Sequence, residues 1–345
     1  MEPGLAAGER TLILAEGFSA DTHYGKTMRG VLRYRRQDVV AILDSARAGE
    51  SEEGVPIVGD VTGALPYEPQ AALVGVATQG GRFPPPWRAI LVDCIEAGLS
   101  IENGLHQMLG DDPELRPLAD RRGVELRDLR RPPEGLDCPT GENLEVPARI
   151  VLTVGSDCAI GKMTVSLELD RAAQARGVDS VFVPTGQTGI AIAGWGISVD
   201  AVIADFVAGA AERLVVEGAR RGGELLWVEG QGSLVHPAYS GVTLGLFHGS
   251  VPHALVLCHR AGTTEVEGYP GHPLPSLAEL VRLHEEIALR ARPAKVVAVA
   301  LNTAGLDTDE AAEAVADAAR ETGLPTADPV RDGAASLLDA VLSGT

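Results

Sequence analysis

The segment VLTVGSDCAIGKMTVSLEL, residues 151–169, constrains the fold more than any other part of this chain. An apolar run typical of a buried strand is followed by a glycine-containing loop, then by Gly-Lys and a helical pattern. Such a strand–loop–helix unit offers unpaired N–H groups and the positive end of a helix dipole to an anion. Five residues separate Gly155 from Gly161, one more than in a Walker A loop. The pattern favours a phosphate-binding loop over a tight turn that carries a surface lysine.

The loop and the first helical turn are the expected phosphate contacts. These residues are Gly155, Ser156, Asp157, Cys158, Ala159, Ile160, Gly161, Lys162, Met163 and Thr164. Met163 stands where a Walker A loop has the Ser or Thr whose hydroxyl binds Mg²⁺. Thr164, one residue later, is the alternative hydroxyl. The loop therefore suits holding phosphates better than splitting them.

Strand and helix patterns alternate on both sides of this segment, which predicts an α/β protein with parallel sheets. We expect a Rossmann-like N-terminal domain over residues 1–131, a Pro- and Gly-rich linker over 132–148, and a P-loop NTPase-like domain over 149–345. The second domain should contain strands at 180–183, 225–228, 254–258 and 296–301. A helix is expected over residues 199–219, where apolar residues recur at helical spacing.

The charge balance limits the partners of the chain. With 29 Lys and Arg against 48 Asp and Glu, the formal net charge is −19. This balance argues against nucleic acid and against an anionic membrane surface, since both need a basic face. No signal peptide and no spanning segment are expected. The four cysteines form no CxxC pair, which indicates reduced thiols and a cytoplasmic protein. We expect a small-molecule substrate and a homo-oligomer.

Glu229 and His236, which follow the strand LLWV, are candidates for catalysis. Glu229 ends this strand, and the carboxyl end of a parallel strand faces the ligand crevice. It can act as a general base or hold Mg²⁺ together with Thr164; an acidic loop residue is the simpler alternative. His236, seven residues later, is the reserve base, and an ordinary loop histidine is as consistent with the pattern.

Two further strand ends carry candidate ligand contacts. The motif PTGQTG places Thr185, Gln187 and Thr188 in a loop of small residues, where they can hydrogen-bond a substrate carboxylate. Asn302 closes the strand VAVALN and offers both a donor and an acceptor, which suits an adenine edge.

The N-terminal half carries weaker signals. YGKT, residues 24–27, resembles part of a phosphate loop, but Gly17 lies too far upstream for a Walker A match. Asp44 ends a strand as a ribose-binding acid would, yet no G-x-G-x-x-G accompanies it. The motif QGGR, residues 79–82, is a candidate for the cleft between the domains.

Over nearly its whole length the chain resembles the D-glutamate N-acetyltransferase family. The resemblance lies in AEGFSADTHYGKT, VGVATQGGRFPPPWR, GSDCAIGKMT, PTGQTG and EGQGSLVHPAYSGVTLGLFHGSVPHALVLCHR. It implies a Rossmann-like domain, a P-loop domain, and transfer of acetyl from acetyl-CoA to the amine of an acidic D-amino acid.

The C-terminal half is similar, more distantly, to dethiobiotin synthetase, an ATP-dependent ligase. That similarity implies Glu229 near Mg²⁺, Asn302 near adenine, and activation of a carboxylate by ATP. A nucleotide-binding sensor without catalysis is a third possibility. Met163 favours the transferase, whereas Glu229 and Asn302 favour the ligase or kinase.

Overall fold

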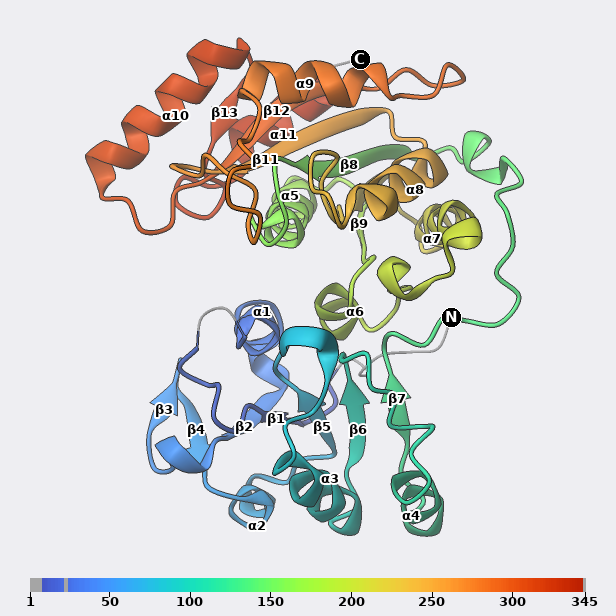
Figure 1. The fold of residues 1–345 in the computed structure, drawn as a ribbon, viewed down its shortest axis with the longest axis vertical. Helices are drawn as coiled ribbons and strands as arrows, with labels where there is room; N and C mark the ends of the chain where they lie inside the picture. The colour runs from blue at the N-terminus through green and yellow to red at the C-terminus, as the bar shows by residue number, and fades with distance from the viewer. Residues whose placement is uncertain (1–7, 22–23, 344–345) are drawn as a thin grey trace. The chain divides into compact units, whose positions relative to one another are not determined.

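The computed structural model describes residues 8–21 and 24–343 and divides them into two compact units. Unit 1 contains the chain up to Pro133 together with Gly186–Ala201, and unit 2 contains Glu134–Thr185 and the chain from Val202 onward. Each unit is an α/β structure with one sheet, as the alternating pattern predicts. Figure 1 shows unit 1 in blue to teal and most of unit 2 in green to red.

Unit 1 contains a seven-stranded sheet in the order β3-β4-β2-β1-β5-β6-β7. All neighbouring strands are parallel except β3 and β4. Its strands are β1 (Thr11–Leu14), β2 (Val39–Leu43), β3 (Ser51–Glu52), β4 (Val55–Val58), β5 (Ala71–Val74), β6 (Ser100–Asn103) and β7 (Leu126–Asp128). Its helices are α1 (Lys26–Arg35), α2 (Val61–Ala64), α3 (Trp87–Glu96), α4 (Leu115–Arg122) and α6 (Gln187–Ala193).

Alternation along β1 explains how both faces of this sheet are covered. Leu12 and Leu14 pack with α2, α3 and α4, whereas Ile13 packs with α1. Successive strand residues point to opposite faces, so a continuous apolar run is typical of a sheet covered on both sides. Ala191 of α6 belongs to the same core as α1. That packing places Gly186–Ala201 in unit 1, although the sequence groups this segment with the second domain.

Unit 2 contains a fully parallel six-stranded sheet in the order β13-β12-β11-β8-β10-β9. Its strands are β8 (Arg149–Gly155), β9 (Ser180–Val183), β10 (Leu225–Val228), β11 (Ala254–Arg260), β12 (Lys295–Asn302) and β13 (Thr326–Ala327). Its helices are α5 (Lys162–Ala175), α7 (Val207–Arg220), α8 (Ser240–Ser250), α9 (Leu277–Glu286), α10 (Thr308–Thr322) and α11 (Ala335–Ser343).

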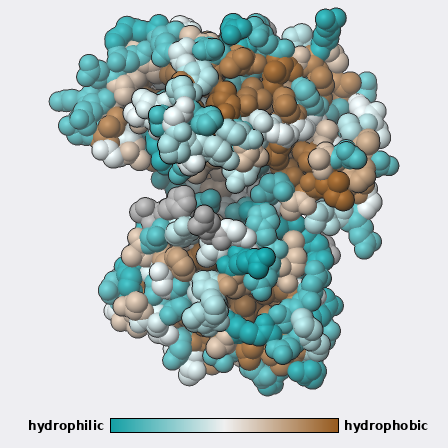
Figure 2. Space-filling view, viewed as in Figure 1, coloured by the Kyte–Doolittle hydropathy of each residue, from teal (hydrophilic) through white to brown (hydrophobic). Residues whose placement is uncertain are grey.

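Neighbouring residues of β10 show how this second sheet is covered. Trp227 is fully buried in a core with α5 and α11. Leu226 points the other way and meets Gly218 of α7, where a Cβ would come within 3.2 Å of its side chain. The outward surface of α10, which carries many acidic residues, is hydrophilic (Figure 2). Every helix within the described ranges is too short or too polar to cross a bilayer.

The segment that we expected to be a linker packs on unit 2. The N–H groups of Thr140 and Gly141 donate to the Glu212 carboxylate on α7 at 2.6 and 2.7 Å. The Asn143 amide donates to the Gly249 carbonyl on α8 at 2.6 Å. These bonds hold the segment against the helices of the second sheet.

The helix expected over residues 199–219 begins later than the periodicity predicts. Two short 3₁₀ turns, Val199–Ala201 and Ala204–Phe206, precede α7. Ile203 between them is extended, with φ −56° and ψ 136°, and is 69% exposed. The chain passes from unit 1 to unit 2 between Ala201 and Val202. The extended backbone at this crossing interrupts the helical pattern.

Candidate functional site

The phosphate-loop sequence lies at the carboxyl edge of the second sheet, near its centre. It follows β8, which is flanked by β10 and β11, and leads into α5 (Figure 1). Within the loop Ala159 has φ +51° and Gly161 has φ +112°. Only glycine adopts the second value readily, because a Cβ would be strained there. The strand, loop and helix predicted from residues 151–169 are therefore present.

Several hydrogen bonds from neighbouring strand ends hold the loop in shape. The Ser156 hydroxyl and His259 Nδ1 are 2.8 Å apart, and Ser233 Oγ donates to the Ser156 carbonyl at 2.9 Å. The Asp157 carboxylate accepts from the backbone N–H groups of Cys158 and Glu267, each at 2.7 Å. A loop fixed in this way needs little reorganisation when an anion binds.

Lys162 is a buried cation of the site and is 6% exposed. Its ammonium donates to the Asp157 carbonyl at 2.6 Å. Its arm lies against two glycines: a Cβ on Gly155 would come within 3.2 Å of Nζ, and one on Gly230 within 3.0 Å of Cδ. Burial lowers the pKa of Lys162, while Cys158 and other nearby groups, Glu229 among them, oppose this shift.

The start of α5 can offer backbone N–H groups to an anion. Gly161 is the N-cap residue, and no side chain caps the first N–H groups. Those groups have no carbonyl partner inside the helix. Thr164 lies in the first turn and is half-buried. An uncapped helix end beside a buried lysine provides the positive environment that a phosphate needs.

Glu229 follows β10 and is 5% exposed. Its Oε2 accepts from the Thr185 N–H at 3.0 Å, and its carbonyl accepts from the Thr185 hydroxyl at 2.6 Å. Gln231 Nε2 donates to the same hydroxyl at 3.1 Å. Thr185, which is fully buried, therefore orients Glu229.

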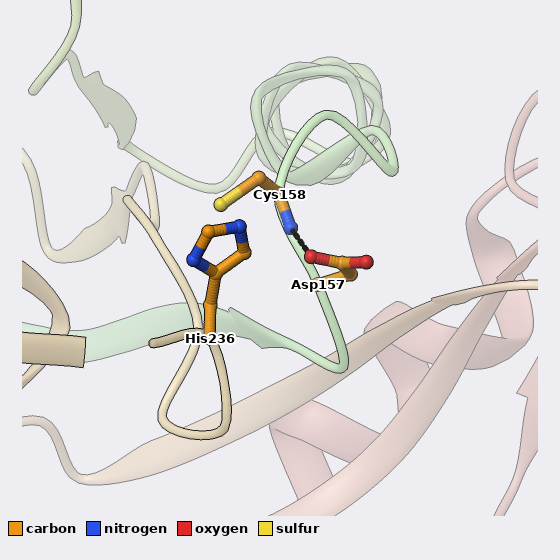
Figure 3. Close-up of side chains that lie close together, drawn as sticks. All are labelled: Asp157, Cys158 and His236. Atoms are coloured by element: carbon orange, nitrogen blue, oxygen red, sulfur yellow. Dashed lines mark hydrogen bonds between the residues drawn. The ribbon is translucent and has the colours of Figure 1, made fainter. Parts of the chain in front are cut away.

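His236 lies beside the phosphate loop and is 3% exposed. Its ring contacts those of Tyr239 and Tyr269, with centroids 4.6 and 5.1 Å away. Figure 3 shows this ring next to the Cys158 thiol and the Asp157 carboxyl, and the three potential ligand atoms lie within 4.8 Å of one another.

The hydrogen bonding of His236 decides what its ring can do. Nδ1 accepts from the Ala238 N–H at 3.1 Å, which places the proton of the neutral ring on Nε2. His236 thus presents an N–H donor, and not the free lone pair that a general base or a metal ligand requires. Both Asp157 oxygens already accept N–H groups, and Lys162 adds a positive charge. This arrangement favours an anion over a metal cation.

The remaining predicted contacts lie in different places. The Asn302 amide donates to the Ile160 carbonyl at 3.1 Å, and its oxygen accepts from the Ala304 N–H at 3.0 Å, so it supports the phosphate loop. Gln187 and Thr188 are part of unit 1, whereas Thr185 is part of unit 2. Thr188 is buried, and its hydroxyl is 2.9 Å from that of Thr27.

Sequence reasoning missed His259 and Ser233 as supports of the loop. Burial lowers the pKa of His259, so the ring is neutral where it meets Ser156. A signal for it existed: His259 directly follows the strand expected over residues 254–258, and parallel strands end at the same edge of a sheet. Nothing in the sequence pattern pointed to Ser233 or to the Glu267 N–H.

Comparison with known proteins identifies the family. A P-loop domain described as a domain of unknown function, DUF1611_C, matches residues 137–338, and a Rossmann-like domain, DUF1611_N, matches residues 43–132. The chain belongs to the DUF1611 family. It therefore combines a Rossmann-like N-terminal domain with a P-loop C-terminal domain, which confirms the predicted fold class.

Two curated relatives and one crystal structure are similar over most of the chain. A D-glutamate N-acetyltransferase from Tritonibacter scottomollicae is 41% identical over 270 residues, which cover 78% of this chain and 80% of the relative. A D-glutamate N-acetyltransferase from a Pseudoalteromonas species is 38% identical over 77% of this chain and 79% of the relative. A DUF1611 protein from Anabaena variabilis superposes with a TM-score of 0.91 at 44% identity, covering 97% of this chain and 99% of that one.

Proposed function

We propose that this protein transfers the acetyl group of acetyl-CoA to the amine of D-glutamate. The observation that carries the proposal is the identity of about 40% to two relatives of that name over more than three quarters of this chain. The site is consistent with it, because the loop offers a lysine and helix N–H groups. Met163 also occupies the position where a Walker A loop carries the Ser or Thr hydroxyl that binds Mg²⁺. Acetyl transfer needs phosphate recognition without phosphate cleavage.

In this proposal the loop binds phosphates of CoA. Lys162 supplies the charge, the start of α5 supplies N–H groups, and His236 supplies a neutral N–H donor beside Cys158. The uncapped helix end and the glycines packed around the Lys162 arm support this fit. Ser156, Asp157 and Asn302 act as positioning residues because they bond within the loop or to its neighbours.

The length of CoA bears on the choice of catalytic base. The pantetheine arm between the phosphates and the thioester has about as many backbone bonds as four extended residues, which span roughly 13 Å. A base must lie within about 3 Å of the amine that attacks the thioester. Glu229 lies close enough to Lys162 to influence its pKa. If the loop holds the phosphates, Glu229 is too near them to reach the amine, and we propose that it supports Lys162 instead of serving as the base.

Glu229→Gln distinguishes these two roles. We expect kcat at saturating acetyl-CoA to stay within about 3-fold of wild type, with any change confined to the KM for acetyl-CoA. The glutamine retains an oxygen acceptor for the Thr185 N–H, so the loop should keep its shape. A kcat lowered by about 10²–10⁴ with an unchanged acetyl-CoA KM is the signature of a lost base, and would place the acetyl group at Glu229.

The activity itself is tested by mixing the purified protein with acetyl-CoA and D-glutamate. The proposal predicts N-acetyl-D-glutamate by mass spectrometry and one CoA thiol released for each product. L-glutamate, D-alanine and ATP with Mg²⁺ in place of acetyl-CoA are the control reactions. Phosphate release from ATP that depends on an acidic amino acid, without acetylation, would instead support the ligase or kinase alternative.

We also propose that the protein works in the cytoplasm, where acetyl-CoA is available, and that it self-associates. Apolar surface gathers over α7 (Figure 2), and Ile203 just before this helix is 69% exposed. Exposed apolar patches on a folded unit favour contact with another protein surface.

A further inference from the structure

A second polar site lies in unit 1, outside the phosphate loop. A cleft of about 470 Å³ is lined by Gly80, Arg82, His106 and Gln107. All four residues are exposed. The volume is in the usual range for small-molecule sites, about 300–1,000 Å³. Gly80 and Arg82 belong to the motif QGGR, residues 79–82, which has no role in the phosphate-loop site.

The two walls of this cleft are fixed against each other. Gly81 has φ +63°, and a Cβ there would lie 2.4 Å from His106 Cδ2 and 2.8 Å from its backbone nitrogen. The Gln107 N–H donates to the Gly81 carbonyl at 3.0 Å, and the Phe83 N–H donates to Gln107 Oε1 at 3.3 Å. Close backbone approach of this kind requires glycine and leaves little freedom for the walls to move.

A buried polar network supports the wall that carries His106. Asn103, which is fully buried, accepts from the Leu105 N–H and donates to the Gln107 carbonyl, both at 2.9 Å. It also donates to Asp128, whose carboxylate accepts the N–H groups of Leu109 and Gly110 at 2.8 and 2.9 Å. Satisfied buried networks rigidify the loops that they hold.

The structure brings a predicted substrate contact to the same wall. A Cβ on Gly104 would come within 2.9 Å of Gln187 Cγ. Gln187 begins α6, which packs in unit 1, and it is half-buried. Residues from QGGR and from PTGQTG, far apart in the sequence, thus both contact the segment of residues 104–107.

The charge of the cleft suits an anion. Arg82 is exposed, and it makes no ion pair with any residue of 8–21 or 24–343. The nearby carboxylate of Asp200 is paired with Arg130. Because the chain as a whole has a net charge of −19, an acidic substrate must find a local positive group to bind. Arg82 has the planar fork that matches a carboxylate.

We propose that the cleft formed by Gly80, Arg82, His106 and Gln107 binds a carboxylate of the amino-acid acceptor, with Arg82 as the principal contact. The proposal rests on the proposed function for the identity of the acceptor. The amides of Gln107 and Gln187 are the nearby groups that can add neutral hydrogen bonds.

The test compares Arg82→Gln and Arg82→Lys with Arg116→Gln, which removes another exposed arginine of unit 1 from its pair with Asp120 on α4. Arg82→Gln should raise the KM for D-glutamate about 10-fold and leave the KM for acetyl-CoA unchanged. Arg82→Lys should give an intermediate KM, because it keeps the charge and loses the fork. Arg116→Gln should match wild type.

Calorimetry with glutarate, which has both carboxylates and no amine, tests the site without catalysis. Wild type should bind glutarate, and Arg82→Gln should bind it at least about 10-fold more weakly. If wild type binds glutarate in this way but acetylates no acidic amino acid, the proposed function fails while the carboxylate site stands. Equal affinities of wild type and Arg82→Gln for glutarate, or equal KM values for D-glutamate, would overturn the proposal.

Discussion

Replacing Lys162 by alanine should weaken acetyl-CoA binding by at least ~10-fold and as much as ~100-fold. A hydrogen bond between a charged donor and a phosphate contributes about 1.5–3 kcal/mol, and Lys162 is the buried cation of the loop. Isothermal calorimetry on the purified variant measures the change directly. Lys295→Ala is the matched control, since Lys295 is exposed and pairs with Glu285. An unchanged dissociation constant in folded Lys162→Ala would remove the phosphate-loop interpretation.

We expect Lys162→Ala to fold, because burying the charged lysine is unfavourable in the folded protein. Burial lowers the pKa of Lys162 below its ordinary value of 10.5, so the unfolded chain binds this proton more tightly than the folded one. Folding stability from this group therefore rises as the pH increases from the lowered pKa toward 10.5, and keeping the buried group protonated below that range costs stability. Its removal should leave the unligated protein at least as stable as wild type.

Gly230→Ala should destabilise unit 2 and also impair phosphate binding. A Cβ at this position would lie 1.8 Å from the Thr153 carbonyl oxygen and 3.0 Å from Lys162 Cδ. The first contact is with the backbone of β8 and cannot be relieved by a side-chain rotation. Overpacking of this kind costs about 1–3 kcal/mol or more, because strands must move apart. Thermal denaturation and acetyl-CoA titration of the variant measure the two effects.

Gly241→Ala is the control for that substitution. Gly241 lies on α8, a short way further along the chain, and is exposed. A Cβ added to it would point into open space, with no neighbouring side chain or strand backbone within 4 Å. Alanine in a helix is as stable as glycine or more so. A wild-type melting temperature for Gly230→Ala would mean that the close packing of β8, β10 and the Lys162 arm is not as described.

The parts of the fold that follow from local pattern were predicted well. The strand at 180–183 and the strand at 225–228 have the expected bounds, and the helix after Lys162 begins where the glycine loop ends. Apolar runs and glycine positions act over a few residues, so a single sequence contains them. The prediction that a helix begins at residue 199 was wrong, because the backbone is extended at Ile203, where the chain passes from one unit to the other.

The sequence predicted at which edge of the sheet the candidate site residues lie, but not the hydrogen bonds that they make. Because parallel strands end at the same edge of a sheet, the sequence predicted that Glu229 lies beside the phosphate loop. It could not show that the Thr185 hydroxyl and N–H both bind Glu229, or that Ala238 fixes the tautomer of His236. These contacts depend on how a loop turns back on itself. The grouping of Gln187 with unit 1 likewise depends on tertiary packing that no periodicity encodes.

Thermal denaturation with each candidate ligand tests the central claim most directly. A ligand at 100 times its dissociation constant stabilises the folded state by about 2.7 kcal/mol, enough to raise the melting temperature measurably. We predict that acetyl-CoA raises the melting temperature of wild type and much less that of Lys162→Ala, and that ATP with Mg²⁺ has little effect on either. Stabilisation by ATP with Mg²⁺ and none by acetyl-CoA would contradict the account.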